Sequence, residues 1–440
     1  MSAGPATATT AAACSALGQR IVAEADTIQA DLCTQSRRWD GGFTRRRLLA
    51  GAGMVAAASL GSQLVTTRHA YAAAGTGNGK TLVTVFLRGG MDGLATVVPG
   101  NNATYNSARS TIGIPTATLL PLDSTFGLHP SCAPLYPLWE SGQLGMVHAV
   151  GSPTSDRDHF ASQARMEKGE DTASIPSGWL DRALLLSGPG TTFRAVSEGH
   201  TVSTALQGDN DTVAMQGIGA LVFDNPAANI GSTLQALYTG LDNPLEELMA
   251  TAIRAVAAAV PVQATPPGPA NGAVYGADDF GRAMADVARL IKADAGLKVA
   301  TVDLGGWDLH TNAGVWDDGD QKNFLADFSK TMAAFATDIG SHMADVTVVT
   351  MSEFGRRLEM NGSGGTDHGF GGLMFLMGGM VRGGRMHGDW PGLETLDHGD
   401  LTIANDYRDI LSEVAQKTLN LGNVSTLFPR YTAVPKGVMV

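Results

Sequence analysis

The sequence is poor in cysteine, which excludes a fold held together by disulfide bridges. Three cysteines occur in 440 residues, Cys14, Cys33 and Cys132, and only Cys132 lies beyond residue 72. A single thiol cannot form an intramolecular disulfide, so stability there must come from a hydrophobic core and from any bound metal. With 44% hydrophobic residues, the chain is long enough to bury a large core.

The sequence also lacks several patterns that would assign a class of function. No P-loop, dinucleotide-binding fingerprint, zinc-finger spacing or internal repeat is present. Beyond residue 72 no apolar run is long enough to span a bilayer, so we expect no stable membrane anchor. The formal net charge is -12, and the first 72 residues contain seven Arg against four acids. The remainder is therefore strongly acidic, which argues against nucleic-acid binding as the main function.

Residues 44–72 have the features of an export signal. Thr44-Arg45-Arg46-Arg47 precedes a mildly apolar run from Leu48 to Val65 that is rich in Gly and Ala. Ala70-Tyr71-Ala72 fits a small-x-small cleavage site, and Arg68 disfavours the general secretory route. A single transmembrane anchor is the alternative, but the run is short and poorly apolar for that role. The pattern predicts export by the twin-arginine translocase to the periplasm or beyond the cell.

The expected organisation is a signal peptide with its n-region over 1–72 and one domain over 73–440. Apolar runs rich in β-branched residues predict buried strands, which alternate with helix-like segments as in α/β proteins. The clearest predicted strands are Lys80–Leu87, Gly145–Val150, Leu297–Asp303 and Val346–Thr350. In open parallel sheets, ligands bind beyond the carboxyl ends of the strands. The loops that follow these strands are therefore the places to look for a site.

Acids or histidines occur in the segments that follow all four strands. They are Asp92, His159, Asp308 with His310, and Asp367 with His368. Each alone is explained equally well as a turn residue, a helix cap or a packed histidine. Gathered at one sheet edge, these carboxylates would repel one another unless a cation offset the repulsion. Mixed Asp and His ligands suit Zn²⁺ or Mn²⁺ better than Ca²⁺, so we expect one or two such ions.

Polar residues near these junctions are candidates for catalysis. Ser155 and Asp158 precede a predicted helix whose N-terminal dipole favours bound anions, and ordinary capping of that helix is the alternative. Arg356 and Arg357 follow the strand at 346–350. Either guanidinium could hold an anion through a bidentate contact, and the sequence does not decide between them.

Seven short segments, in order along nearly all of residues 73–440, carry a family resemblance. They are Leu87-Arg-Gly-Gly-Met-Asp-Gly-Leu, Asp158-His-Phe, Gly178-Trp-Leu, Gly306-Trp-Asp-Leu-His, Ser352-Glu-Phe-Gly-Arg, Gly365-Thr-Asp-His-Gly and Gly388-Asp-Trp-Pro-Gly. At these segments the sequence resembles the DUF1501 family, secreted proteins of unassigned function. That family is similar in turn to the alkaline phosphatase and sulfatase superfamily.

The resemblance implies a mostly parallel central sheet flanked by helices, alkaline-phosphatase-like, with a metal site at the strand ends. It implies that Asp92, Asp308, His310, Asp367 and His368 are ligands and that His387 is a candidate for a further one. The superfamily places its nucleophile at a helix start after an early strand, where Thr154, Ser155 and Ser162 are available. The sequence has no Cys-x-Pro-x-Arg pattern, so formylglycine chemistry is not expected.

Two functions follow as hypotheses. One is an exported metal-dependent hydrolase of phosphate or sulfate esters, acting on a small molecule or a glycan. The alternative is a non-catalytic secreted metal- or glycan-binding protein on the same fold, because fold alone does not establish activity. A redox enzyme is a weaker third hypothesis, since no cofactor motif supports it.

Overall fold

The computed structural model describes residues 79–440 apart from 155–156, 173, 223–230, 232–235, 237, 241–243 and 265–267. The expected signal peptide, residues 1–72, and the candidate nucleophile Ser155 lie outside the described residues. Within the described part of the chain, no helix combines the length and the apolar character needed to cross a bilayer.

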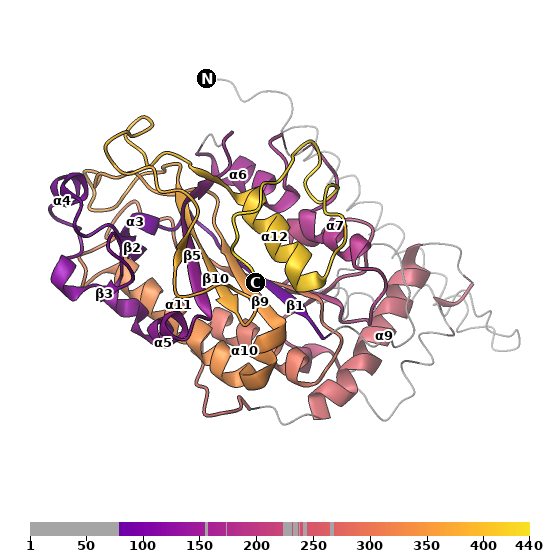
Figure 1. Cartoon of the computed structure of the whole chain (residues 1–440). Helices are drawn as coiled ribbons and strands as arrows, with labels where there is room; N and C mark the ends of the chain where they lie inside the picture. Colours follow the sequence, from indigo (N-terminus) through magenta and orange to yellow (C-terminus); the bar gives the residue numbers. More distant parts are fainter. Residues whose placement is uncertain are drawn as a thin grey trace, which may run out of the picture.

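A mixed sheet of nine described strands forms the centre of the molecule (Figure 1). Its order is β11-β5-β10-β9-β1-β8-β6-β7, and β12 also pairs with β5. The strands are β1 (Thr81–Leu87), β5 (Leu144–Gly151), β6 (Ala195–Glu198), β7 (Val213–Met215), β8 (Val299–Leu304), β9 (Val346–Met351), β10 (Gly372–Gly378), β11 (Met386–His387) and β12 (Asn405–Asp406). Only the two ladders of β10, with β5 and β9, are antiparallel. The predicted fold class, a mostly parallel sheet flanked by helices, is confirmed.

Strand β1 is buried along its whole length because helices cover both faces of the sheet. Val83, Val85 and Leu87 contribute to the core on one face, and Leu82 and Phe86 to the core on the other. This division follows the two-residue period of a strand, and burial on both faces explains why the sequence reads as a continuous apolar run.

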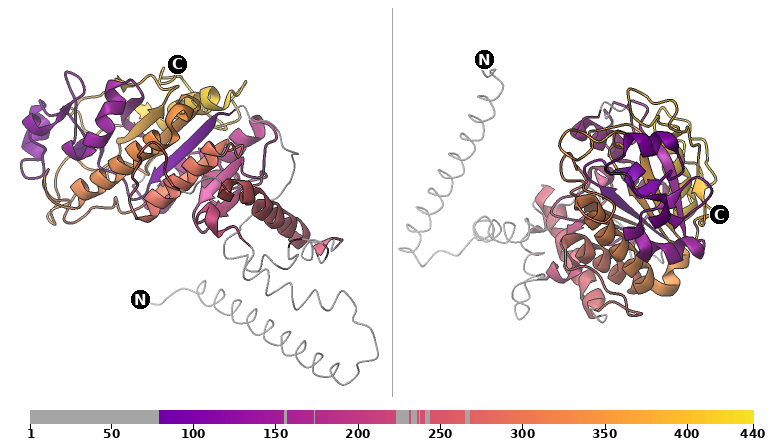
Figure 2. Two further views of the ribbon diagram at one scale, coloured as in Figure 1. Left: turned by 90° about the horizontal axis from the view of Figure 1, so that it is seen from below. Right: turned by 90° about the vertical axis from the view of Figure 1, so that its left-hand side faces the viewer.

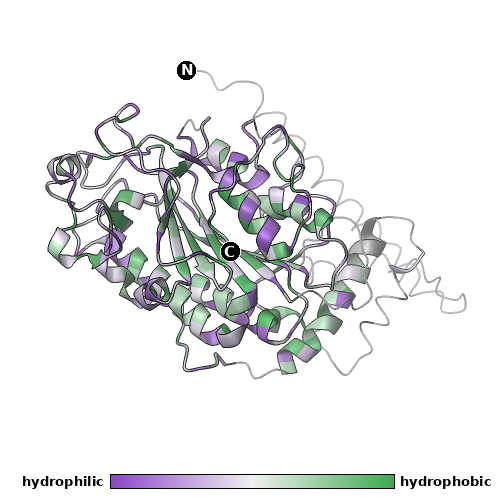
Figure 3. Cartoon of the chain, viewed as in Figure 1, coloured by the Kyte–Doolittle hydropathy of each residue, from purple (hydrophilic) through white to green (hydrophobic). Residues whose placement is uncertain are grey.

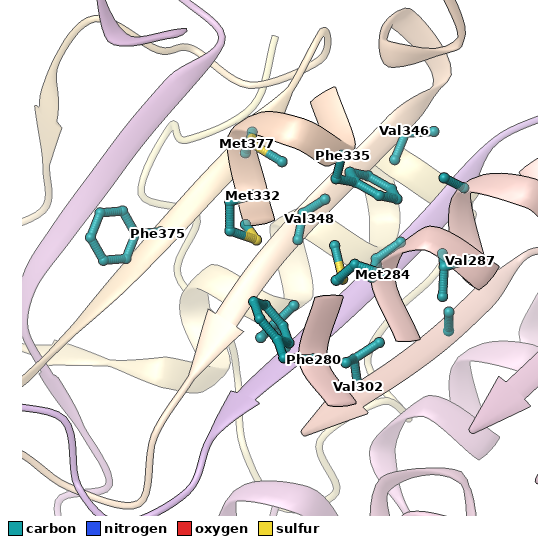
Figure 4. Packing of buried hydrophobic residues seen from close by; sticks show 14 of the residues in the cluster. Phe280, Met284, Val287, Val302, Met332, Phe335, Val346, Val348, Phe375 and Met377 are labelled. Atoms are coloured by element: carbon teal, nitrogen blue, oxygen red, sulfur yellow. The ribbon is translucent and has the colours of Figure 1, made fainter. Parts of the chain in front are cut away.

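One face of the sheet is covered by α10 (Asp279–Lys292) and α11 (Asp320–Ile339), with α5 (Tyr136–Glu140) and α9 (Pro244–Ala264) contributing to the same core (Figure 2). Side chains of α10 and α11, such as Met284 and Phe335, pack against strand residues such as Val348 (Figure 4).

The other face is covered by α7 (Trp179–Leu186) and α12 (Tyr407–Leu419), and α6 (His159–Lys168) contributes Met166 to the same core. In Figure 3 hydrophobic colour gathers on the central strands, and hydrophilic colour appears on α12.

A small sheet packs at one side, built from β2 (Val97–Val98), β3 (Leu120–Pro121) and β4 (Gly127–Leu128), with α3 (Gly93–Thr96) and α4 (Ala103–Ala108) nearby. Short 3-10 helices complete the described elements: η1 (Thr116–Thr118), η2 (Pro130–Leu135), η3 (Thr204–Leu206), η4 (Ile218–Ala220) and η5 (Gly340–Asp345).

The register of the central strands brings their ends level. Phe86 of β1 pairs with Met351 of β9 and with Asp303 of β8. Because β10 runs in the opposite direction, the segment that precedes it lies at the same edge as the segments that follow β1, β8 and β9. The loop between β9 and β10 therefore meets the loops after β1 and β8 at the carboxyl edge of the sheet, and the loop after β5 joins them because β5 is also antiparallel to β10.

His148 in β5 is buried as a neutral imidazole. Its Nδ1 accepts a hydrogen bond of 2.9 Å from Ala149 N, so Nε2 carries the proton and donates to Val97 O at 3.1 Å. Burial lowers the pKa of His148 to about 4, from an ordinary value of 6.5. Because the unfolded chain then binds more protons between these two values, this contribution is fully present above pH 6.5 and is lost as the pH falls toward 4.

We expect the free energy of unfolding to fall by about 3 kcal/mol more in the wild type than in His148→Gln between pH 7 and pH 4, because glutamine has no proton to gain. Chemical denaturation at a series of pH values measures this difference. Parallel pH profiles for the two proteins would contradict the neutral, buried state of His148.

Candidate metal centre

Three of the sequence-predicted ligands converge at the carboxyl edge of the sheet. They are His159 at the start of α6, Asp308 in the loop after β8 and His368 in the loop before β10. One ligand atom from each residue lies within 4.8 Å of the other two. His368 Nε2 is 3.1 Å from Asp308 Oδ1, and His159 Nε2 is 3.4 Å from Asp308 Oδ2. We call these three residues the metal cluster.

His310 and Asp367 adjoin the metal cluster. His310 Nε2 lies 3.1 Å from Asp308 Oδ1 and 2.9 Å from His368 Nε2. On the other side of its ring, His310 Nδ1 lies 3.0 Å from Asp367 Oδ1, which also accepts from Asn361 Nδ2 at 2.9 Å. The hydrogen bonds from Asn361 and His310 lower the pKa of Asp367. Asp367 therefore orients His310, and His310 extends the set of available ligands.

The loop before β10 lies directly on the loop after β8. Thr366 N donates to Leu309 O at 3.0 Å, and Asn361 Nδ2 donates to His310 O at 2.9 Å. A Cβ on Gly365 would collide with the backbone of residues 309–310, so only glycine allows this approach. This contact brings Asp367 and His368 beside Asp308 and His310, which are far away in the sequence.

Three histidines lie at the site: His159, His310 and His368. Each turns Nδ1 toward an oxygen acceptor and Nε2 toward Asp308. His368 Nδ1 lies 2.8 Å from Arg157 O, and His159 Nδ1 lies 3.7 Å from Glu353 Oε1. With a proton on each Nδ1, the Nε2 lone pairs point at the carboxylate of Asp308. His159 Nε2 is buried and forms no hydrogen bond with any described residue.

This donor set fits a divalent cation. Two imidazole nitrogens 2.9 Å apart, both close to a carboxylate oxygen, are electron-rich atoms that a cation would stabilise. Acceptors on the far sides of the rings, such as Asp367 and Arg157 O, are the outer partners that commonly orient metal-binding histidines. Mixed imidazole and carboxylate ligands match the preferences of Zn²⁺ and Mn²⁺.

Arg356 positions Asp308. Its Nη2 donates to Asp308 Oδ1 at 2.6 Å, and its side chain is only 1% exposed. Its other hydrogen bonds go to the backbone carbonyls of Gly89, Gly90, Trp307 and Thr366. Burial by itself would raise the pKa of Asp308, but the hydrogen bond and positive charge of Arg356 hold it at about 2, so the carboxylate is ionised at neutral pH. The geometry thus gives Arg356 a positioning role in place of the expected anion contact.

Glu353 is a site residue that sequence reasoning did not single out. Its carboxylate is fully buried and accepts hydrogen bonds from Gly89 N at 2.8 Å, Gly90 N at 2.8 Å and Gln163 Nε2 at 2.6 Å. It thereby fixes the glycine turn after β1 and faces His159. The signal in the sequence was its place directly after the strand at 346–350, but its partners are backbone groups that no pattern reveals.

Asp92 is not part of the metal cluster. Its Oδ2 pairs with the buried Arg109 Nη1 at 2.8 Å, and its Oδ1 caps α3 by accepting from Ala95 N at 3.0 Å. Arg109 also donates to the carbonyls of Leu358 and Arg357 at 2.7 and 2.8 Å. Asp92 therefore joins α3 and α4 to the loop after β9. His387, in β11, lies 2.7 Å from Arg382 O through Nε2 and likewise does not enter the metal cluster.

The candidate catalytic residues before α6 have mixed outcomes. Asp158 caps α6 by accepting from Ala161 N at 2.8 Å, as the capping alternative expected. Thr154 is exposed, and its hydroxyl lies 3.2 Å from Ser152 Oγ. Ser162 is buried, and its hydroxyl forms no hydrogen bond with a described residue. The role of Ser155 as nucleophile stays a prediction.

Comparison with known proteins confirms the family resemblance over part of the chain. The model of a family described as "Protein of unknown function (DUF1501)" matches residues 231–414, which include four of the predicted ligands: Asp308, His310, Asp367 and His368. No curated protein matches the sequence.

Solved structures with a similar arrangement are remote. They include the C-terminal periplasmic domain of EptC from Escherichia coli in complex with Zn, at 10% identity and a TM-score of 0.32, covering 72% of this chain and 76% of that one. The lipoteichoic acid synthase LtaP from Listeria monocytogenes has 10% identity and a TM-score of 0.31, with 88% and 79% covered. A sulfatase from Pseudoalteromonas sp. has 10% identity and a TM-score of 0.32, with 86% and 72% covered. At these values the likeness assigns no activity.

We expect the chain without residues 1–72 to bind Zn²⁺ through the metal cluster. His159→Ala and His368→Ala should each weaken binding by about 100-fold or more, because each removes a direct ligand. Asp92→Asn should leave the affinity within about twofold, because Asp92 is engaged by Arg109. Competition with a chromophoric chelator measures these affinities, and exposed His398→Ala is the matched control. Loss of binding in Asp92→Asn but not in His159→Ala would contradict the cluster.

Proposed function

We propose that this protein is an exported, metal-dependent hydrolase of phosphate or sulfate esters. The observation that carries the proposal is the convergence of His159, Asp308 and His368 within 4.8 Å at the carboxyl edge of an α/β sheet. That edge is where such sheets bind ligands. The expected substrate is a small-molecule or glycan ester.

His159, Asp308 and His368 would hold the ion, with His310 as a further ligand of the same ion or of a second one. When bound, such an ion supplies Lewis-acid polarisation of an ester oxygen and activation of water or a hydroxyl. Arg356 keeps Asp308 ionised and fixed, and Asp367 fixes the ring of His310. Glu353 holds the glycine turn beneath the site. These contacts pre-organise the ligands before substrate binds.

The hydrolase is tested by turnover of p-nitrophenyl phosphate and p-nitrophenyl sulfate after loading with Zn²⁺ or Mn²⁺. We expect Asp308→Asn to lower kcat by about 10³-fold, because it weakens the binding of the ion. If Ser155 is the nucleophile, Ser155→Ala should lower kcat by a similar factor, while Thr154→Ala should retain activity. Equal activity of wild type and Ser155→Ala would exclude Ser155 as the nucleophile.

The second candidate function is a non-catalytic metal- or glycan-binding protein. The two described hydroxyls beside α6 favour it, because Thr154 is bonded to Ser152 and Ser162 is buried. Metal bound in stoichiometric amount, with no turnover of any phosphate or sulfate ester, would support this function over the hydrolase.

Export through the twin-arginine route is tested in cells that express the full chain. We expect the double variant Arg45→Lys/Arg46→Lys to accumulate as an uncleaved precursor in the cytoplasm, because the translocase reads the arginine pair and lysine does not replace it. Fractionation and immunoblotting measure the distribution, with Arg37→Lys/Arg38→Lys as the matched control. Unchanged export of the first variant would exclude this route.

A further inference from the structure

Phe354 lies beside the metal cluster, and the proposed function gives it no role. The residue is 1% exposed, and its ring contacts two of the three residues of the metal cluster. The ring centres of Phe354 and His368 are 4.6 Å apart, and those of Phe354 and His159 are 5.0 Å apart. The two imidazoles lie 4.4 Å from each other at an angle of 78°. Three rings, two of them from predicted ligands, therefore pack together at the carboxyl edge of the sheet.

Hydrogen bonds orient the other two histidines of the site. His310 Nδ1 lies 3.0 Å from Asp367 Oδ1, and His368 Nδ1 lies 2.8 Å from Arg157 O. Because Nδ1 and Nε2 belong to one rigid ring, a partner at Nδ1 also fixes the direction in which Nε2 points. Acceptors of this kind commonly orient histidines that bind a metal.

His159 has no such hydrogen bond with a described residue. Its Nδ1 is 3.7 Å from Glu353 Oε1, which is beyond hydrogen-bond distance, and that oxygen already accepts from Gln163 Nε2 at 2.6 Å. Its Nε2 is buried and unbonded, yet it points to within 3.4 Å of Asp308 Oδ2. Among the contacts of the described residues, ring packing is therefore what holds the imidazole of His159 in this direction.

The ring of Phe354 is itself held in place by the glycine turn after β1. A Cβ on Gly90 would lie 2.6 Å from Phe354 Cε2 and 2.7 Å from Cδ2, so the ring fills the space over this glycine. The turn is fixed in its own right, because Gly90 N donates to Glu353 Oε2 at 2.8 Å and Gly90 O accepts from Arg356 Nε at 2.7 Å. Phe354 thus offers the two imidazoles a rigid surface.

We propose that Phe354 is the positioning residue of His159: its ring replaces the hydrogen-bonded acceptor that orients His310 and His368. Tilted aromatic rings at these separations attract each other. A fixed ring also restricts the rotamers of His159, so less conformational entropy is lost when an ion binds. Phe354 acts on the metal only through this imidazole. Its effect on metal affinity rests on the proposed function, whereas its effect on the orientation of His159 does not.

The first experiment measures the Zn²⁺ affinity of the purified chain by competition with a chromophoric chelator. We expect Phe354→Leu to weaken binding by about 10-fold, as loss of an outer partner of a ligating histidine commonly does. Phe375→Leu is the matched control, because Phe375 is also 1% exposed but its ring packs on Phe328, 5.4 Å away. The control should change the affinity by less than about twofold. Equal losses in the two variants, at comparable stability in chemical denaturation, would overturn the proposal.

The second arm asks whether Phe354 acts through His159. In the His159→Ala background, adding Phe354→Leu should lower the remaining Zn²⁺ affinity by less than about twofold, because the imidazole that it positions is gone. A further loss of about 10-fold would show that Phe354 acts through His368 or through the fold, and would overturn the assignment to His159.

The third arm needs no metal. In metal-free protein labelled with ¹³C-histidine, the spectrum of His159→Ala identifies the ring signals of His159. We expect Phe354→Leu to shift and broaden these signals, because the imidazole loses its aromatic neighbour and gains motion, while Phe375→Leu leaves them in place. Unmoved signals in Phe354→Leu would overturn the proposal. Shifted signals in a protein that binds no Zn²⁺ would refute the proposed function and still confirm that Phe354 orients His159.

Discussion

The geometry of the site depends on the hydrogen bonds between the segment 353–356, after β9, and the glycine turn after β1. Glu353 accepts hydrogen bonds from the N–H groups of Gly89 and Gly90, and Arg356 donates to the carbonyls of the same two glycines. A side chain on Gly89 would collide with Asp308 N, so the turn also fixes the loop after β8. Both charged groups are buried, and both are satisfied by several partners, which is the condition under which buried charge is tolerated. Three strand ends are locked together in this way.

Much of the metal cluster could be predicted from the sequence, because strand ends are visible in it. The apolar runs predict strands that correspond to β1, β5, β8 and β9. Because ligands bind beyond the carboxyl ends of parallel strands, the residues that follow these strands were expected to lie together, and His159, Asp308 and His368 do. The strand β10 was not predicted, since its Gly-rich sequence has no clear alternation. It nevertheless lies between β5 and β9 and, running antiparallel to both, places His368 at the correct edge.

The roles of Asp92, Glu353 and Arg356 could not be predicted, for a shared physical reason. Each is decided by partners far away in the sequence that carry no pattern of their own: a buried arginine for Asp92, backbone amides for Glu353 and backbone carbonyls for Arg356. An acid after a strand is equally suited to bind metal, cap a helix or pair with an arginine. Asp92 does the last two, because Ala95 N bonds to one of its oxygens and Arg109 to the other.

Charge compensation around the site separates metal binding from folding. Asp308 is paired with Arg356, Glu167 and Asp303 are paired with Arg88, and Asp400 lies between two arginines. The carboxylates at this edge therefore have protein partners before any cation binds. Helices on both faces of the sheet bury a large hydrophobic core, and this core stabilises the fold. Small metal-binding domains differ, because they fold only when the metal binds. It follows that ligand substitutions in the metal cluster should alter metal affinity without unfolding the chain, which makes the hydrolase and the non-catalytic alternative distinguishable with the same folded variants.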